Sequence, residues 1–174
     1  MLDNGKAKID DTFNELKIEI PTRKNWFVIT FIFIWMVGWY MGFTSAIGSF
    51  GENAFMTFWL IGWTVGGLSA AYFTLWSLFG KEIILIDYQY MTIEKSILGI
   101  GTKSRLEITE IRNVRYEFVD TSMFANRRNN MTSFGVGTGP IRIDYGLKTF
   151  SFGLSVEEAE ANYIVELIRK KIKK

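Results

Sequence analysis

The chain reads NWFVITFIFIWMVGWYMGFTSAIGSFGENAFMTFWLIGWTVGGLSAAYFTLWSLFG from Asn25 to Gly80. These 56 residues contain one charged side chain, Glu52, and no Lys, Arg or Pro. All six tryptophans of the protein lie in this stretch. A soluble domain does not easily cover so much contiguous apolar surface. The hydrocarbon core of a bilayer is about 30 Å thick, and a helix of roughly 20 apolar residues crosses it. The stretch is long enough for two such helices.

We predict a first helix over about residues 26–44 and a second over about residues 54–79. A run of this length is too long to be a single strand. The segment between them, residues 44–53, is rich in Gly and Ser and is typical of a turn. The sequence therefore predicts a transmembrane helical hairpin over residues 25–80.

The basic residues that flank this hairpin predict its orientation. Arg23 and Lys24 precede the first helix and Lys81 follows the second, whereas the turn contains no Lys or Arg. Basic residues accumulate on the cytoplasmic side of a membrane. We therefore expect a multi-pass protein of the cytoplasmic (inner) membrane, with both termini in the cytoplasm and the turn outside.

Small residues four positions apart occur in both predicted helices, at Gly38 and Gly42 and at Gly62, Gly66 and Ala70. Such pairs let helix backbones approach closely. At about 1.5 Å per residue, Gly38 falls at the depth of Gly66, and Gly42 at that of Gly62. This match favours packing of the two helices within one chain, and contact between chains in a homo-oligomer is the rival interpretation. Neither helix contains an ionisable residue, which argues against a transport function.

Composition limits the chemistry that the rest of the chain can perform. The protein has no Cys and no His, so it lacks a thiol nucleophile, the commonest general base and the commonest transition-metal ligand. We therefore predict no catalytic site, no metal site and no cofactor. The net charge of +2 does not indicate a nucleic-acid partner, and the tryptophans that could stack on bases all lie in the hairpin.

The N-terminal arm, residues 1–24, contains one strand-like segment. Residues 15–20 alternate apolar and charged side chains, which is the pattern of a half-buried strand, and Pro21 ends it. Two interpretations stay open: the segment joins the sheet of the C-terminal domain across the hairpin, or it is an interfacial tail. The hydrophobic run begins too late and is too long for a secretory signal.

Residues 81–174 show short strand patterns followed by one helix. The predicted strands have turn signals between them, a spacing typical of a small antiparallel barrel or sandwich; they cover residues 83–86, 90–98, 102–107, 114–119, 141–145 and 148–152. Ser155 and Glu158 form a capping box at the start of the final helix. Its apolar stripe predicts a helix that closes one end of the barrel: Val156, Ala159, Tyr163, Ile164, Leu167 and Ile168.

Two passages carry a resemblance to a known fold family. Residues 105–114, RLEITEIRNV, and residues 152–159, FGLSVEEA, resemble passages of bacterial pleckstrin-homology-like (PH-like) and GRAM-like domains. The first resembles the passage between two strands, and the second the entry into the last helix. The resemblance covers about residues 83–172. It implies a membrane α-helical hairpin joined to a small, mainly antiparallel PH-like barrel, an arrangement common in small bacterial membrane proteins. The family has no single activity.

Three basic residues fit the spacing of a phosphoinositide site. Lys95, Lys103 and Arg105 follow the pattern of cations that PH domains direct at phosphates. Cations on alternating strand positions are also ordinary surface residues, and weak attraction to anionic lipid is the more general interpretation.

Residues 120–139 form the longest stretch without periodicity, and loops of this length in compact domains are often functional. Four of their side chains could contact headgroups or a protein partner: Phe124, Arg127, Arg128 and Phe134. A plain strand connection is the alternative. The three glycines at its end do not indicate a phosphate loop, because Pro140 and a predicted strand follow them instead of a helix.

These observations favour a membrane-anchored, non-enzymatic interaction module. We expect it to act as an accessory or assembly subunit that binds a protein partner at the cytoplasmic membrane face. A peripheral sensor of anionic lipid and a carboxylate-based membrane enzyme are the two alternatives.

Overall fold

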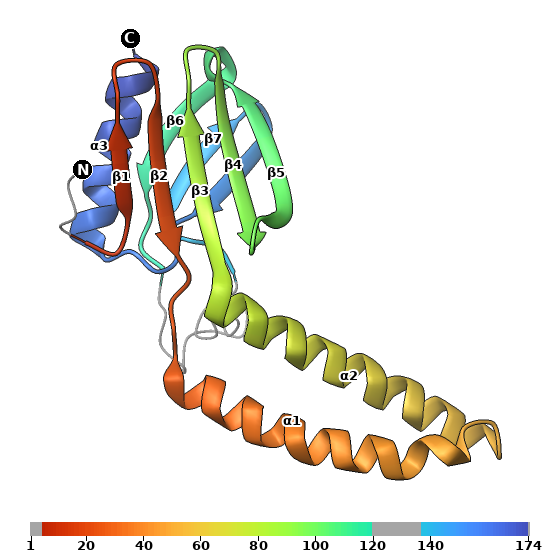
Figure 1. Ribbon diagram of the computed structural model, residues 1–174. Helices are drawn as coiled ribbons and strands as arrows, with labels where there is room; N and C mark the ends of the chain where they lie inside the picture. Colours follow the sequence, from red (N-terminus) through yellow and green to blue (C-terminus); the bar gives the residue numbers. More distant parts are fainter. Residues whose placement is uncertain (1–4, 120–136, 174) are drawn as a thin grey trace. The chain divides into compact units, whose positions relative to one another are not determined.

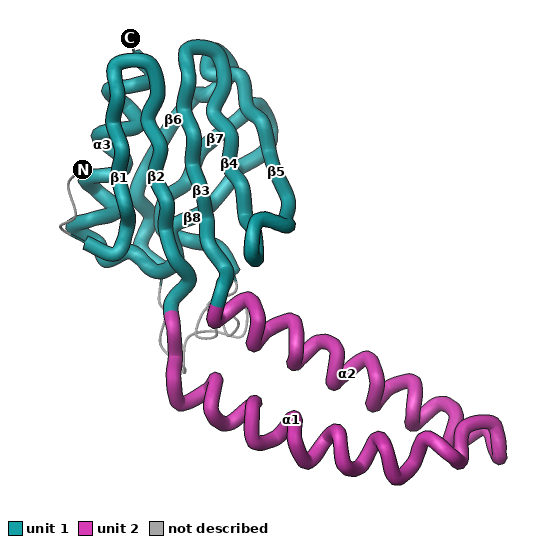
Figure 2. The backbone as a smooth tube through the Cα atoms, viewed as in Figure 1, with its two compact units in different colours: residues 1–23, 79–174 teal, residues 24–78 magenta. Residues whose placement is uncertain are grey.

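The computed structural model describes residues 5–119 and 137–173, which form two compact units. Residues 24–78 make up the helical unit, and residues 1–23 together with 79–174 make up the β unit (Figure 2). The N-terminal arm, which the sequence presents as a separate segment, therefore belongs to the same unit as the C-terminal domain.

The helical unit consists of α1 (Trp26–Ala46), the short 3-10 helix η1 (Ile47–Ser49) and most of α2 (Ala54–Phe79). The side chain of Asn25 caps α1 by accepting a hydrogen bond from the backbone N–H of Val28 at 3.3 Å. The prediction of two long apolar helices is confirmed, and each is long and apolar enough to cross a membrane. α1 continues two residues beyond its predicted end.

Hydroxyl groups in α1 and α2 donate hydrogen bonds within their own helices. Thr64 donates to the carbonyl of Leu60 at 2.7 Å, Ser69 to that of Val65 at 2.8 Å, and Thr74 to that of Ala70 at 2.9 Å. A hydroxyl that bonds the preceding turn needs no water. These hydroxyl groups therefore have hydrogen-bond acceptors within their own helix and need none from outside it.

The two helices contact each other through tryptophan rings. The indole Nε1 of Trp39 donates to the carbonyl of Trp63 at 2.9 Å, and Nε1 of Trp63 donates to the carbonyl of Trp39 at 3.4 Å. The ring of Trp39 fills the space beside Gly67, where any Cβ would clash with it. The ring of Trp63 lies 3.5 Å from the Cβ position of Gly42.

The predicted contact of glycine against glycine is therefore wrong. Among the described residues, no heavy atom lies within 4 Å of the Cβ positions of Gly38, Gly62 or Gly66. The indole rings hold the helix backbones further apart than a pair of facing glycines would. Ala70 is partly buried and accepts the Thr74 hydrogen bond.

The first sheet of the β unit has five antiparallel strands in sequence order (Figure 1). They are β1 (Lys8–Asp11), β2 (Leu16–Pro21), β3 (Gly80–Ile86), β4 (Tyr90–Ile97) and β5 (Ile100–Glu107). β2 pairs directly with β3, with Leu16 opposite Ile86 and Pro21 opposite Lys81. The helical unit is thus inserted between two neighbouring strands of one sheet.

The register of this sheet places apolar side chains in rows across its inner face. One row consists of Ile9, Ile18, Ile84 and Ile93, and the next consists of Leu16, Ile86, Met91 and Leu106. All eight side chains are buried. Cross-strand neighbours of this kind are the main source of sheet stability, so these rows form half of the core.

The second sheet and the last helix supply the other half of the core. The short helix η2 (Ile108–Glu110) leads into β6 (Ile111–Tyr116), β7 (Ile141–Tyr145) and β8 (Lys148–Phe152), which pair in that order. α3 (Glu158–Ile172) packs on the core through Ala161, Ile164, Val165 and Ile168. Among the described residues, no strand of one sheet pairs with a strand of the other, so closure into a barrel is not seen.

The start of α3 differs from the predicted capping box. The helix begins at Glu158, after Glu157 in the N-cap position, and Ser155 does not cap it. Ser155 is buried instead, and its hydroxyl donates a hydrogen bond of 2.5 Å to the carbonyl of Pro21 at the end of β2. This long-range bond takes the hydroxyl away from the helix. The buried face of α3 also differs from the predicted apolar stripe: Ala159 and Tyr163 are exposed, whereas Ala161 and Val165 are buried.

Candidate functional site

Lys95 is partly exposed and already has an ion-pair partner. It shares the inner face of the first sheet with Glu82, its cross-strand neighbour, and its Nζ lies 2.9 Å from Oε1 of Glu82. Glu82 is only 7% exposed, and its other carboxylate oxygen accepts a hydrogen bond from the backbone N–H of Gly153 at 2.6 Å. Lys95 therefore neutralises a buried carboxylate and is already engaged.

Thr102 on β5 pairs with Lys95 on β4, so both side chains point to the same face of the sheet. Successive side chains on a strand point to opposite faces, so Lys103 and Arg105 lie on the other face. Nζ of Lys103 lies 3.1 Å from Oε2 of Glu94. The guanidinium carbon of Arg105 lies 3.7 Å from the centroid of the Tyr90 ring, a cation–π contact. The structure thus brings Lys103 and Arg105 to one face and Lys95 to the other, and the three cations do not converge on one phosphate.

The other four candidate contact residues lie outside the described residues: Phe124, Arg127, Arg128 and Phe134.

Charged side chains on β6 and β7 form a paired cluster. Nε of Arg142 lies 2.9 Å from Oε2 of Glu117, and Arg115 forms an ion pair with Asp144. The hydroxyl of Thr149 donates to Asp144 at 2.9 Å. The hydrogen bond from Thr149 and then that from Arg115 hold the pKa of Asp144 below its usual value. Because Arg115 and Arg142 each have a carboxylate partner, they are not the convergent free cations that make an anion-binding site.

A groove of about 500 Å³ runs between β1 and α3. Its floor and walls are mainly apolar, from Ala7 and Ile9 on one side and Ala159 and Tyr163 on the other. The volume falls in the range of sites that bind small molecules. Tyr163 is 43% exposed, so its ring is half available to a binding partner.

Polar contacts fix one end of this groove. The backbone N–H of Ala7 donates to Oε1 of Glu160 at 2.7 Å, and Nζ of Lys6 lies 3.1 Å from Oε1 of Glu157. β1 is an edge strand, and an edge strand exposes unpaired backbone groups. Glu160 satisfies one backbone group beside this edge and ties it to the first turn of α3.

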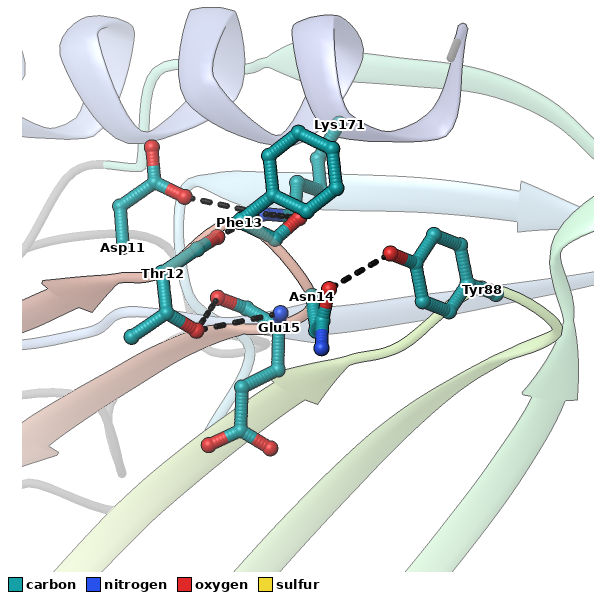
Figure 3. Close-up of polar contacts among 7 residues, drawn as sticks. All are labelled: Asp11, Thr12, Phe13, Asn14, Glu15, Tyr88 and Lys171. Atoms are coloured by element: carbon teal, nitrogen blue, oxygen red, sulfur yellow. Dashed lines mark hydrogen bonds and ion pairs between the residues drawn. The ribbon is translucent and has the colours of Figure 1, made fainter.

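Contacts with Lys171 fix the far end of α3 to the turn between β1 and β2 (Figure 3). Its Nζ lies 3.0 Å from Oδ1 of Asp11 and donates to the carbonyl of Thr12 at 2.5 Å. Asn14 in the same turn accepts a hydrogen bond at 2.7 Å from the hydroxyl of Tyr88, which lies in the turn between β3 and β4. Polar contacts therefore tie β1 and its flanking residues to both ends of α3.

The sequence prediction did not find this groove because it did not find β1. One signal was present: the apolar Ala7 and Ile9 alternate with charged Lys6, Lys8 and Asp10. The alternation is short and contains only one β-branched residue, so strand patterns do not single it out.

Comparison of the sequence with models of known protein families and with curated proteins found no match.

Proposed function

We propose that this protein is a membrane-anchored, non-enzymatic interaction module. The observation that carries this proposal is the apolar surface of α1 and α2. Among the residues of these two helices, Ile29, Leu60 and Gly67 are buried, whereas large side chains such as Phe31 and Phe58 are exposed. A water-soluble protein rarely exposes a contiguous apolar patch of this size, and a bilayer covers it without cost.

Both helices span the cytoplasmic membrane in this proposal, and the β unit lies in the cytoplasm. Arg23, Lys24 and Lys81 support this orientation, because they flank the helices on the side of the termini and the turn has no basic residue.

The β unit is a PH-like domain in this proposal. Five and three antiparallel strands followed by a C-terminal helix support the resemblance carried by residues 105–114 and 152–159. The absence of His and Cys from the sequence supports a non-enzymatic role. We place the module as an accessory or assembly subunit of a membrane complex.

We place the contact with a protein partner at the groove between β1 and α3. Its mainly apolar lining and its exposed tyrosine are features of protein interaction sites, which are enriched in aromatic anchors. The lipid-sensing alternative receives less support, because Lys95, Lys103 and Arg105 each contact a side chain of the protein itself.

The topology can be tested by cysteine labelling, since the protein has no Cys. In intact cells, a membrane-impermeant maleimide should label Glu52→Cys in the turn. Lys148→Cys in the β unit should be labelled only after the cells are permeabilised. Labelling of Lys148→Cys in intact cells would show that the orientation is reversed, and equal labelling of both positions would exclude a spanning hairpin.

The partner site can be tested by substitution of Tyr163. A tagged full-length protein, purified from native membranes in mild detergent, should retain a stoichiometric partner. Tyr163→Asp should weaken this retention by at least about tenfold, because aromatic anchors contribute most to such interfaces. Leu147→Asp, in the exposed turn between β7 and β8, is the matched control and should retain the partner. A monomer or homo-oligomer without a partner would contradict the proposal, and retention by Tyr163→Asp would exclude the groove.

A further inference from the structure

The turn between β4 and β5 has an unusual residue at its tip. Ile97 pairs with Ile100, so Leu98 and Gly99 form a two-residue hairpin loop. Their φ angles are +51° and +88°. Positive φ at both positions is the geometry of a type I′ turn, which strongly favours Asn-Gly. Among the described residues, Leu98 is the only residue other than glycine with a positive φ.

This turn also presents apolar side chains to the outside. Leu98 is 72% exposed and Ile100 is 84% exposed. Turn geometry does not favour leucine at this position, since a branched side chain in the left-handed region is strained. Packing in the core does not require it either, because the side chain is exposed. A residue that is unfavourable for the turn and unpacked in the β unit points to a contact outside it.

A row of side chains that includes a charged pair lies between the β4–β5 turn and the apolar core of the first sheet. Moving along the inner face from the isoleucine row, the next row contains Ile20, Glu82, Lys95 and Thr102. The ion pair between Glu82 and Lys95 lies in this row. Ile97 and Ile100 follow it, so their apolar surface is not continuous with the core.

The register places the turn at the end of the sheet where the chain connects to the helical unit. Gly80 pairs with Ile97, and Gly80 directly follows Phe79, the last residue of α2. Thr22, which leads towards α1, donates its backbone N–H to the carbonyl of Gly80 at 3.1 Å. Both connections to the helical unit therefore leave from the row of the sheet that contains Ile97 and Ile100. Neighbouring strands lie about 4.8 Å apart, and the turn joins the two strands that are one and two spacings from β3, the strand that directly follows α2.

We propose that the turn between β4 and β5 inserts Leu98 and Ile100 into the boundary between headgroups and acyl chains of the bilayer. The inference rests on the proposed membrane-spanning function of α2. If α2 spans, its last residue lies at the membrane surface, and the paired row of the sheet lies at that surface too. The lipid boundary then covers the apolar tip, in the manner of interfacial segments that bury apolar side chains 5–10 Å deep. The β unit would thereby contact the membrane at a third point, besides its two connections to the helices.

Single cysteines with a polarity-sensitive fluorophore test this contact in the full-length protein. The protein is reconstituted as one copy per lipid nanodisc, with nitroxide-labelled lipids as quenchers. Leu98→Cys should show a blue-shifted emission and strong quenching by nitroxides near the headgroups. Tyr88→Cys is the matched control: Tyr88 is 71% exposed and lies in the turn at the other end of β3 and β4. Tyr88 is about 25 Å from the turn between β4 and β5, because β4 separates the two turns, and Tyr88→Cys should show neither effect.

Leu68→Cys, in the middle of α2, separates failure of this inference from failure of the proposed function. Quenching of Leu68→Cys by deep nitroxides, with Leu98→Cys behaving like Tyr88→Cys, would overturn the inference and leave the spanning helices intact. Absence of quenching at Leu68→Cys would overturn both. A blue shift at Leu98→Cys without nitroxide quenching would indicate that protein covers the turn, which also overturns the inference.

A second variant removes the apolar tip without disturbing the turn. Leu98→Asn suits the left-handed conformation, so it preserves the hairpin. In Leu98→Asn/Ile100→Cys, quenching by headgroup nitroxides should be lost or strongly reduced relative to Ile100→Cys alone. Unchanged quenching would show that Leu98 does not hold the turn in the bilayer.

Discussion

Replacing Glu82 with Ala is expected to lower the free energy of unfolding of the β unit by about 3 kcal/mol. The substitution leaves the ammonium of Lys95 without its partner on the inner face of the sheet. It also leaves the backbone N–H of Gly153 without an acceptor, and an unsatisfied buried donor costs about 1–3 kcal/mol. Glu82 thus connects β3 both to β4, through Lys95, and to the chain that follows β8, through Gly153.

Hydrogen exchange is the suitable measurement, because all six tryptophans lie in the helical unit and their fluorescence does not report on the β unit. A loss of 3 kcal/mol should speed the slowest amide exchange in β4 and β7 by roughly 100-fold, at about 1.4 kcal/mol per factor of ten. Exchange in α1 and α2 should not change.

Two further variants separate the Glu82–Lys95 pair from a second cross-strand ion pair. Glu94→Ala removes the partner of Lys103, whose side chain is 65% exposed, and should cost less than about 1 kcal/mol. The double variant Glu82→Met/Lys95→Met removes both charges of the first pair and should recover part of the loss. Equal effects of Glu82→Ala and Glu94→Ala would show that the buried carboxylate has no special role.

The accuracy of the sequence prediction follows the range of the interaction that determines each feature. Both apolar helices, and a strand ending near Pro21, follow from patterns within a few residues. The capping box at Ser155 is also a local pattern, but there a bond to Pro21, 134 positions away, prevails. β1 forms because it pairs with β2 and contacts α3, and neither contact is visible in the five residues around Ile9.

The candidate cations illustrate the same limit. Lys95, Lys103 and Arg105 are equivalent in the sequence, since all are basic residues on predicted strands. Only the register shows that Lys95 faces Glu82 whereas Lys103 faces Glu94. The contact between α1 and α2 also depends on side chains that the sequence pattern does not pair. The Trp39 ring lies against Gly67, which is outside the predicted glycine pairs.

Ile18→Ala is expected to lower the free energy of unfolding of the β unit by about 3–4 kcal/mol, within the range for a buried isoleucine reduced to alanine. Ile18 is fully buried at the centre of the row formed by Ile9, Ile84 and Ile93. Its strand, β2, is an inner strand with β1 on one side and β3 on the other. The cavity would therefore open in the middle of the first sheet.

Lys17→Ala is the matched control on the same strand. Lys17 points to the outer face, where its Nζ lies 2.7 Å from Oε1 of Glu19, and loss of an exposed ion pair costs less than about 1 kcal/mol. Hydrogen exchange in β3 and β4 measures both variants. If residues 15–20 behaved as an interfacial tail, the two substitutions would have equally small effects on these strands.

The position of β2 inside the first sheet also limits which fragments of the protein can fold alone. The β unit is assembled from both sides of the helical unit, and Thr22 bonds Gly80 across 58 positions of the chain. A fragment that begins at Lys81 lacks β1 and β2, and it exposes the edge of β3 together with the apolar Ile84 and Ile86. We expect this fragment to aggregate, because an exposed apolar edge strand pairs with other chains. Supplying residues 5–23 through a short linker before Gly80 should restore a soluble fold, and recovery of a soluble, protected fragment without them would show that β2 is dispensable.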